Sequence, residues 1–249
     1  MQKNTSKHKV LLLKPASQAD SMVNTLCAAG MEVHLMPTIE IAAMDDISVL
    51  RTAVNKIQQY DIAIFTSRHA VDHALRIIQK FPAQLTVFAI GPATQQALVD
   101  GGISIRCMPE HYNSEGLLAL PELSRVDNKQ IVVFAGVGGR TLLIDSLIQR
   151  GAKITKVECY RRLLPKNDIN PQLAKLKKNG VDVMVVTSNE IVENLLVLAD
   201  KMYHSWLCKI PVIAPSERVA AYVQQRGFTA DILVAENASE DGILRALGI

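Results

Sequence analysis

The stretch Ile62-Ala63-Ile64-Phe65-Thr66-Ser67 places two hydroxyl residues directly after four apolar ones, and a stretch with the same pattern, Val183-Met184-Val185-Val186-Thr187-Ser188, follows 121 positions later. In both places the next residues have the apolar period of an amphipathic helix. A short apolar run that ends in Ser or Thr before such a helix is typical of a β-strand leading into a capped helix. The two stretches therefore predict two copies of one strand, turn and helix.

The similarity between the two copies extends on both sides of these stretches. Four further matches occur in order along the chain: Val10 with Ile131, Gly30 with Gly151, residues 87–94 with residues 211–216, and Ser114-Glu115-Gly116 with Ser239-Glu240-Asp241-Gly242. Strands that alternate with helices in this way predict an α/β fold with parallel sheets and right-handed crossovers. The repeat leaves open which strands share a sheet, because the early strands of one copy could complete the late strands of the other.

The charge balance excludes one class of partner. The 249 residues include 27 Lys and Arg against 24 Asp and Glu, a formal net charge of +3, and 49% of them are hydrophobic. A chain of this kind can bury a sizeable core but has no basic stripe for nucleic acid, which proteins bind by neutralising its phosphates. We expect no nucleic-acid partner, whereas a small acidic ligand could still be held by local groups.

The first residues and the cysteines indicate a cytoplasmic protein. The first nine residues are polar and lack the apolar core of a signal peptide, and no apolar run reaches the ~18–20 residues that span a bilayer. The four cysteines are widely spaced, at positions 27, 107, 159 and 208, and form no C-x-x-C pair. This spacing predicts free thiols in a reducing compartment, and we expect no membrane partner.

Small polar residues recur where a predicted strand meets the next helix. Five turns share this feature: Thr66-Ser67, Gly91-Pro92-Ala93-Thr94, residues 136–140, Thr187-Ser188-Asn189 and Pro215-Ser216-Glu217. Ser and Thr oxygens cap helices, and the free N–H groups at helix N-termini also attract anions. In open parallel sheets these turns lie at the carboxyl ends of the strands, where ligands bind. Both helix capping and anion binding therefore remain open for each turn.

The stretch Glu158-Cys159-Tyr160-Arg161-Arg162 lies at the end of a strand-like run that begins at Ile154, between the two copies. A tyrosine followed by two arginines has no obvious place in a core strand. We therefore expect it on the connection between two lobes, facing a cleft. Tyr160 could fill space there with its hydroxyl bonded to a neighbour, or it could act as a general acid.

Two other motifs indicate alternative sites. Residues 136–141, Gly-Val-Gly-Gly-Arg-Thr, resemble a dinucleotide-binding turn, with Glu158 placed 22 residues after Gly136, but their sixth position is not glycine. The matching turn of the first copy, residues 14–17, contains no glycine. His69 and His73 share a helix face and could bind a metal, but no third ligand is indicated, so we expect solvated histidines and no metal site.

Taken together, the motifs resemble the uroporphyrinogen-III synthase family over nearly the whole chain. The residues that carry the resemblance are Phe65-Thr66-Ser67 with Ala70-Val71, residues 89–94, Gly136 with Gly139-Arg140, Leu142 and Gly151, Val157 with Tyr160-Arg161, and Thr187-Ser188. The resemblance implies two similar parallel-sheet α/β lobes, joined by a two-stranded hinge, with a ligand cleft between them. Lobe 1 would contain residues 1–36 and 166–249 and lobe 2 residues 41–158, with residues 37–40 and 159–165 as linkers.

The resemblance also implies a reaction, the closure of hydroxymethylbilane to uroporphyrinogen III with loss of water and inversion of ring D, in tetrapyrrole and heme biosynthesis. The family's lyase reaction needs no cofactor or metal, and we expect a monomer that has at most a transient contact with the preceding pathway enzyme. Tyr160 matches the family's proposed proton donor. The matching substrate-binding positions are Thr66, Ser67, Gly91, Thr94, Gly136, Arg140, Ser188 and Ser216.

Two alternative functions remain at this point. The first is a module of the same fold that binds or senses an acidic tetrapyrrole without turnover, and the second is a dinucleotide-binding enzyme centred on Gly136. The retained Tyr160 favours the synthase over the sensing module. Pro215-Ser216-Glu217 departs from the Gly-Pro-x-Thr form of the first copy, and this difference weakens the match at Ser216.

Overall fold

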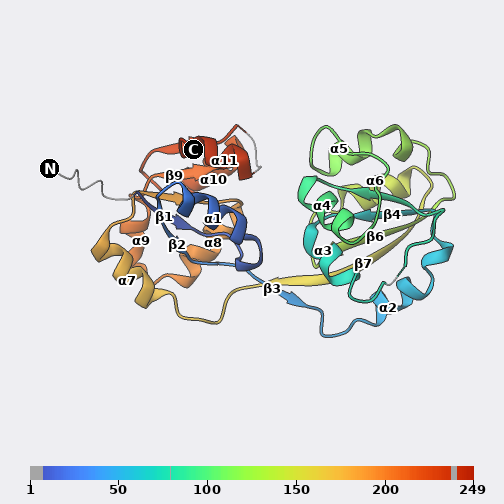
Figure 1. Cartoon of the computed structure of the whole chain (residues 1–249), viewed down its shortest axis with the longest axis horizontal. Helices are drawn as coiled ribbons and strands as arrows, with labels where there is room; N and C mark the ends of the chain where they lie inside the picture. The colour runs from blue at the N-terminus through green and yellow to red at the C-terminus, as the bar shows by residue number, and fades with distance from the viewer. Residues whose placement is uncertain (1–7, 79, 237–239) are drawn as a thin grey trace. The chain divides into compact units, whose positions relative to one another are not determined.

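The computed structural model of the chain describes residues 8–78, 80–236 and 240–249. The chain divides into two compact units (Figure 1). Unit 1 contains Met1–Glu40 and Leu163–Ile249, and unit 2 contains Ile41–Arg162. Each unit is built around one five-stranded sheet.

Sheet A, in unit 1, has the strand order β10-β9-β8-β1-β2, and every neighbouring pair is parallel. Its strands are β1 (Lys9–Leu12), β2 (Glu32–Leu35), β8 (Val183–Val185), β9 (Val212–Ala214) and β10 (Ile232–Val234). The helices of this unit are α1 (Asp20–Ala28), α7 (Asn170–Asn179), α8 (Asn189–Leu198), α9 (Lys201–Leu207), α10 (Glu217–Gln225) and α11 (Glu240–Ala246), with a short 3₁₀ helix at Ala16–Gln18.

Sheet B has the strand order β3-β7-β6-β4-β5, and the pairs β7-β6, β6-β4 and β4-β5 are parallel. Its strands are β3 (Glu40–Ala43), β4 (Ile62–Phe65), β5 (Thr86–Ala89), β6 (Gln130–Gly136) and β7 (Lys153–Leu163). The helices of unit 2 are α2 (Ser48–Asn55), α3 (Arg68–Ala74), α4 (Pro92–Asp100), α5 (Ser114–Ala119) and α6 (Leu142–Gln149), with 3₁₀ helices at Ile57–Gln59 and Pro121–Leu123.

The internal repeat is visible in the sheets, and it answers the question that the sequence left open. The order β2-β1-β8-β9 in sheet A matches β7-β6-β4-β5 in sheet B. The register is also the same, because Val10 pairs with Val183 as Ile131 pairs with Ile62. The early strands of each copy therefore complete the sheet of the late strands of the other copy. The expected α/β class with parallel sheets is confirmed.

The core of unit 2 explains why its strands read as unbroken apolar runs. Alternate residues of β4 and β6 belong to two hydrophobic clusters, one packed with α2, α3 and α4 and the other with α5 and α6. Because both faces of the sheet are covered, residues pointing either way must be apolar. Phe65 and Phe134 stack in the first cluster with their ring centroids 4.6 Å apart. Burial of each ring contributes about 1.5–3 kcal/mol.

The chain crosses between the two units in two neighbouring strands, β3 and β7. The resemblance implied a two-stranded connection, with its first linker at residues 37–40, whereas β3 spans Glu40–Ala43. The residues before β3 are fixed to unit 1 by Thr38, which is fully buried. Its hydroxyl donates to the Ile191 carbonyl at 3.2 Å, and its own carbonyl accepts from Asn194 Nδ2 at 2.9 Å. The end of β2 is therefore held against α8.

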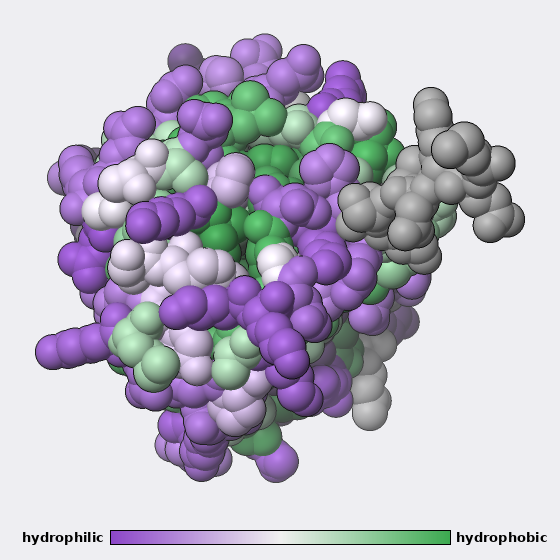
Figure 2. All heavy atoms as spheres, turned by 90° about the vertical axis from the view of Figure 1, so that its left-hand side faces the viewer, coloured by the Kyte–Doolittle hydropathy of each residue, from purple (hydrophilic) through white to green (hydrophobic). Residues whose placement is uncertain are grey.

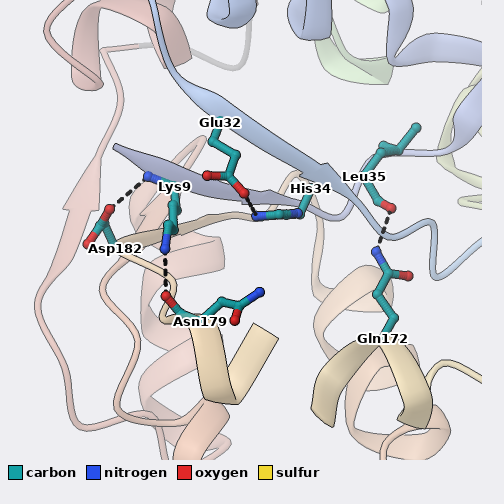
Figure 3. A network of polar contacts seen from close by, with 7 residues as sticks. All are labelled: Lys9, Glu32, His34, Leu35, Gln172, Asn179 and Asp182. Atoms are coloured by element: carbon teal, nitrogen blue, oxygen red, sulfur yellow. Dashed lines mark hydrogen bonds and ion pairs between the residues drawn. The ribbon is translucent and has the colours of Figure 1, made fainter. Parts of the chain in front are cut away.

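Polar contacts also fix the start of β1 and the end of β2 in unit 1 (Figure 3). At the start of β1, the Lys9 backbone N–H donates to Asp182 at 2.7 Å and the Lys9 Nζ donates to the Asn179 carbonyl at 2.6 Å. At the end of β2, Gln172 Nε2 donates to the Leu35 carbonyl at 3.2 Å. These contacts join the early strands to the segment around α7, far away in sequence.

Hydrophilic residues dominate the face of the molecule in Figure 2, with smaller groups of hydrophobic residues between them. Within the described part of the chain, no helix is both long enough and apolar enough to span a bilayer. Nothing in this face departs from the mixed surface that most folded domains present to water.

Candidate functional site

A pocket of about 220 Å³ lies in unit 2 at the carboxyl ends of β4 and β6. Four of the residues that the sequence predicted as functional line it: Thr66, Gly136, Arg140 and Tyr160. Ser114, Lys156 and Arg162 line it as well. The pocket therefore brings together a phenol, three small residues and three cationic side chains.

Tyr160 lies in β7, the strand in which the chain crosses between the units, near the end of the run that begins at Ile154. The strand continues past it to Leu163, and the side chain of Tyr160 is only 5% exposed. The cause is an irregularity in the pairing of β6 with β7, because Ala135 pairs with Glu158 and Gly136 with Tyr160. One extra residue on β7, as in a β-bulge, breaks the alternation of faces, so Cys159 and Tyr160 are both buried.

Gly136 provides the space that the phenol ring occupies. A Cβ atom at this position would lie 2.6 Å from Tyr160 Cζ and 2.9 Å from its hydroxyl oxygen. Real Cβ atoms essentially never approach other atoms so closely. The backbone of β6 therefore forms one wall of the site, and the glycine permits the ring to lie against it.

The expectation that His69 and His73 are solvated is wrong for His69, which is 5% exposed, and His73 is half-buried. Both imidazoles contact the Tyr160 ring. The His69 ring meets it edge-on with centroids 5.4 Å apart, and the His73 ring lies nearly parallel to it at 6.1 Å. Burial lowers the pKa of both histidines below the ordinary value of about 6.5. A lowered pKa favours the neutral form of both imidazoles at pH 7.

Two cations of the pocket are each paired with a carboxylate of the protein. Arg140 Nη1 donates to Glu115 Oε2 at 3.1 Å, and its second nitrogen contacts the other Glu115 oxygen, a fork that recognises carboxylates well. The hydrogen bonds from Arg140 hold the pKa of Glu115 below its ordinary value. Lys156 Nζ donates to Glu158 at 2.7 Å. Both cations are therefore already paired with carboxylates of the protein itself.

The hydroxyl groups of Thr66, Ser67 and Ser188, which follow strands, form hydrogen bonds with the protein backbone. Ser67 Oγ accepts from the Ala70 N–H at 3.1 Å and Ser188 Oγ from the Ile191 N–H at 3.3 Å, so both cap helices. Thr66 donates its hydroxyl to the Phe134 carbonyl at 3.2 Å. The capping interpretation is therefore correct for Ser67 and Ser188. Each of these two hydroxyls keeps a hydrogen that could be donated to a ligand.

The remaining predicted residues lie at other helix starts. Gly91 is the N-cap of α4 and packs against Tyr112. A Cβ atom added at position 91 would lie 3.2 Å from the Cβ of Tyr112. Thr94 is buried in the first turn of α4. In unit 1, Ser216 precedes α10 without a side-chain cap, and it follows β9 as Ser188 follows β8. Since β8 and β9 are parallel neighbours, both serines lie at one edge of sheet A.

The family model described as "Uroporphyrinogen-III synthase HemD" matches residues 20–245 of the chain. The chain belongs to the uroporphyrinogen-III synthase family. A uroporphyrinogen-III synthase of Salmonella typhimurium is 33% identical over 244 residues, which cover 96% of this chain and 99% of the relative. The enzyme of that name from Escherichia coli is 32% identical with the same coverage.

Solved structures with low sequence identity share the fold. A mutant uroporphyrinogen III synthase of Thermus thermophilus has a TM-score of 0.63 at 19% identity and covers 97% of this chain and 99% of its own. The uroporphyrinogen-III synthetase of Helicobacter pylori has a TM-score of 0.64 at 14% identity, with the same coverage. The fold is therefore that of the synthases.

Sequence reasoning on this synthase-family chain missed several residues of the pocket. Lys156 was counted only as part of a strand, although a lysine within a strand-like run was a usable signal. Ser114 was noted only for the repeat. The contact of His69 and His73 with Tyr160 had no signal beyond their shared helix face. Among the described residues, no group of three His, Cys, Asp or Glu side chains could hold a metal ion.

Proposed function

We propose that this chain is a cyclising hydro-lyase that converts hydroxymethylbilane into uroporphyrinogen III, with loss of water and inversion of ring D. The family assignment supports the reaction. The single structural observation that carries the proposal is the position of Tyr160, a phenol at a pocket lined by Arg140, Lys156 and Arg162. A proton donor beside cations suits a substrate that carries carboxylates and must lose a hydroxyl group.

In the proposed reaction Tyr160 donates its proton to the departing hydroxyl group, so that the carbon–oxygen bond breaks and water leaves. The cation that remains on the bilane is attacked by the substituted carbon of ring D, and the resulting spiro intermediate fragments and recloses with ring D inverted. Loss of a ring proton in the last step balances the proton that Tyr160 gave. The net products are uroporphyrinogen III and water.

The pocket would take only part of the substrate. Its volume of about 220 Å³ is below the ~300–1,000 Å³ of typical ligand pockets. We assign the end of the bilane that carries the hydroxyl group to this pocket, with its carboxylates on Arg140, Lys156 and Arg162. Thr66 and Gly136, which line this pocket, are proposed to contact the same end of the bilane. Ser67, Gly91 and Thr94 from unit 2, and Ser188 and Ser216 from unit 1, are proposed to contact the rest of the tetrapyrrole.

The proposed setting follows from this chemistry. The enzyme would act in the cytoplasm as a monomer on a free acidic tetrapyrrole and need neither nucleic acid nor a membrane. Because unassisted closure without inversion competes with the reaction, a transient contact with the preceding enzyme would shorten the lifetime of the free bilane. The main catalytic task is then to hold a folded geometry.

A coupled assay tests the proposal: hydroxymethylbilane is generated in situ, the protein is added, and the oxidised I and III isomers are separated by chromatography. We expect isomer III to dominate with the wild type. Tyr160→Phe should lower kcat roughly 10- to 1000-fold. Tyr60→Phe, which changes a buried tyrosine of the same core cluster, is the matched control and should leave kcat unchanged.

Each outcome of this assay has a clear meaning. If only isomer I forms, the synthase proposal fails. The alternative, a module that binds tetrapyrroles without turnover, would then be tested by titration with uroporphyrinogen III. If isomer III forms but Tyr160→Phe retains full kcat, the reaction stands and Tyr160 is not the acid.

A further inference from the structure

The histidines of α3 make a ring contact that the proposed reaction leaves unexplained. We propose that His69 and His73 are positioning residues, whose rings hold the phenol of Tyr160 in the orientation from which it donates its proton. This inference rests on the proposed function, because it concerns the geometry of the proposed acid. It adds two residues of α3 to the machinery of unit 2.

The geometry of the three rings restricts the phenol in two directions. The His69 ring is inclined at 64° to the phenol and meets it as an edge contact, whereas the His73 ring is inclined at only 17° and lies along it. Gly136 closes a further side, because there is no room for even a Cβ atom between its backbone and the ring. A phenol enclosed by an edge, a face and a backbone cannot turn without moving α3 or β6.

The spacing of the histidines explains why both reach the same ring. Residues four apart lie above one another on one face of a helix, and α3 packs on sheet B with this face. The start of α3 is fixed by the Ser67 cap and by the buried Ala70 and Val71. The two imidazoles are therefore held by a rigid element rather than by a loop.

The charges around the imidazoles support their neutral form. Burial is the main cause that lowers the pKa of each. Asp72 opposes this effect in both, with its Oδ2 3.8 Å from His69 Nδ1. The positive groups Arg68 and Arg162 act on His69 and Arg76 acts on His73, and all three lower the pKa further.

The internal repeat provides a second, independent observation. At the offset of 121 positions, His73 corresponds to Asn194, and Tyr160 corresponds to Ile39 beside the buried Thr38. Asn194 donates to the Thr38 carbonyl at 2.9 Å. In unit 1 the same helix position therefore fixes the chain directly after β2, the strand that matches β7. Both units use this position to hold the residues at the end of the equivalent strand.

His73 is the better target for a test, because it is less buried than His69. We expect His73→Ala to lower kcat about 10-fold with KM within about 2-fold, and to increase the share of isomer I, because the phenol loses one of its walls. His73→Phe keeps a ring at the same place and should stay within about 2-fold of the wild-type kcat. Ile57→Ala, in a 3₁₀ helix of the same cluster, controls for lost stability, and should lower Tm without lowering kcat.

A measurement without substrate separates this inference from the proposed reaction. Aromatic ring carbons of labelled tyrosine are observed by NMR, and the Tyr160 signals are assigned with Tyr160→Phe. Slow ring flipping in the wild type should become fast in His73→Ala and remain slow in His73→Phe. This result is informative even if the wild type makes only isomer I, an outcome that would defeat the proposed function alone.

Two results would overturn the inference. One is a His73→Ala protein with wild-type kcat and unchanged Tyr160 ring flipping, which would mean that the contact with His73 does not restrain the phenol. The other is a His73→Phe protein that loses as much activity as His73→Ala. The imidazole nitrogens, rather than the packing of the ring, would then be required. The corresponding pair His69→Phe and His69→Ala repeats the test at the edge contact.

Discussion

Addition of a single methyl group at Gly136 should displace the phenol of Tyr160. The backbone at Gly136 lies outside the left-handed region, so an alanine would fit the local chain conformation without strain. The conflict is with the ring alone, since the new Cβ would lie 2.6 Å from Tyr160 Cζ. Ordinary contacts begin at 3.4 Å, so the ring must move by about 0.8 Å.

The expected size of the effect follows from two opposing contributions. Overpacking of a tight site costs about 1–3 kcal/mol, whereas replacing glycine by alanine at a permitted conformation returns about 0.4–1 kcal/mol by restricting the unfolded chain. Gly136→Ala should therefore change the free energy of unfolding by at most about 2.5 kcal/mol. Activity should suffer more, because a displacement of this size at a reacting group can cost about 100-fold in kcat.

Two double-mutant cycles test this reasoning by isomer-resolved kinetics and urea unfolding. In a Tyr160→Phe background the acid is already lost, so Gly136→Ala should lower kcat little further, although the clash with Cζ remains. In a Tyr160→Leu background the ring is gone, so Gly136→Ala should no longer destabilise the protein. A Gly136→Ala protein with wild-type kcat would refute the placement of the phenol, as would a 100-fold loss that persists in the Tyr160→Phe background.

Three further predictions concern other groups. Glu115→Gln should lower KM for the bilane a few-fold in steady-state kinetics, because Arg140 would no longer be held by an internal carboxylate. Cys159 is buried, and burial raises the pKa of its thiol to about 12. Under native conditions a thiol reagent should therefore label the exposed Cys27 and spare Cys159, as peptide mass spectrometry would show. The pKa of Asp61 is lowered, chiefly by the hydrogen bond from the first backbone N–H of β6, so its stabilising contribution is present above pH ~4 and lost as the pH falls through the lowered pKa. Asp61→Asn should therefore reduce stability in urea unfolding at pH 7, and its difference from the wild type should shrink as the pH falls through the lowered pKa.

The strands could be predicted from the sequence because burial on both faces produces continuous apolar runs. Ile62–Phe65 was located to the residue, and the run at 131–134 lies within β6. The repeat could not show which strands pair. The same pattern along the chain would result whether each copy formed its own sheet or the early strands of one copy joined the late strands of the other. The first crossing strand was expected only from the family resemblance, which placed it at residues 37–40, because the four residues of β3 at the edge of sheet B are too few to show a strand pattern by themselves.

The site was predicted in part, for a physical reason that Tyr160 illustrates. In a regular strand, successive side chains alternate between the two faces of the sheet. Three polar residues in a row, such as Tyr160-Arg161-Arg162, then indicate that the buried part of the strand has ended. The register shift opposite Gly136 breaks that alternation, and it depends on the pairing of two strands rather than on either sequence alone. The histidines could not be assigned before that shift was known, because without it the phenol would point to the other face of sheet B.

The two copies of the repeat also indicate why only one of them carries the proposed acid. Gly136 corresponds to Pro15 and Tyr160 to Ile39, so unit 1 has neither the open backbone nor the phenol. Where unit 2 packs rings against Tyr160, unit 1 has the hydrogen bonds of Thr38 with Ile191 and Asn194, which fix the chain to α8. The same framework thus anchors the chain in one unit and holds the proposed proton donor in the other. An asymmetric ring closure, in which one hydroxyl leaves and one ring is inverted, needs a single donor and not a symmetric pair.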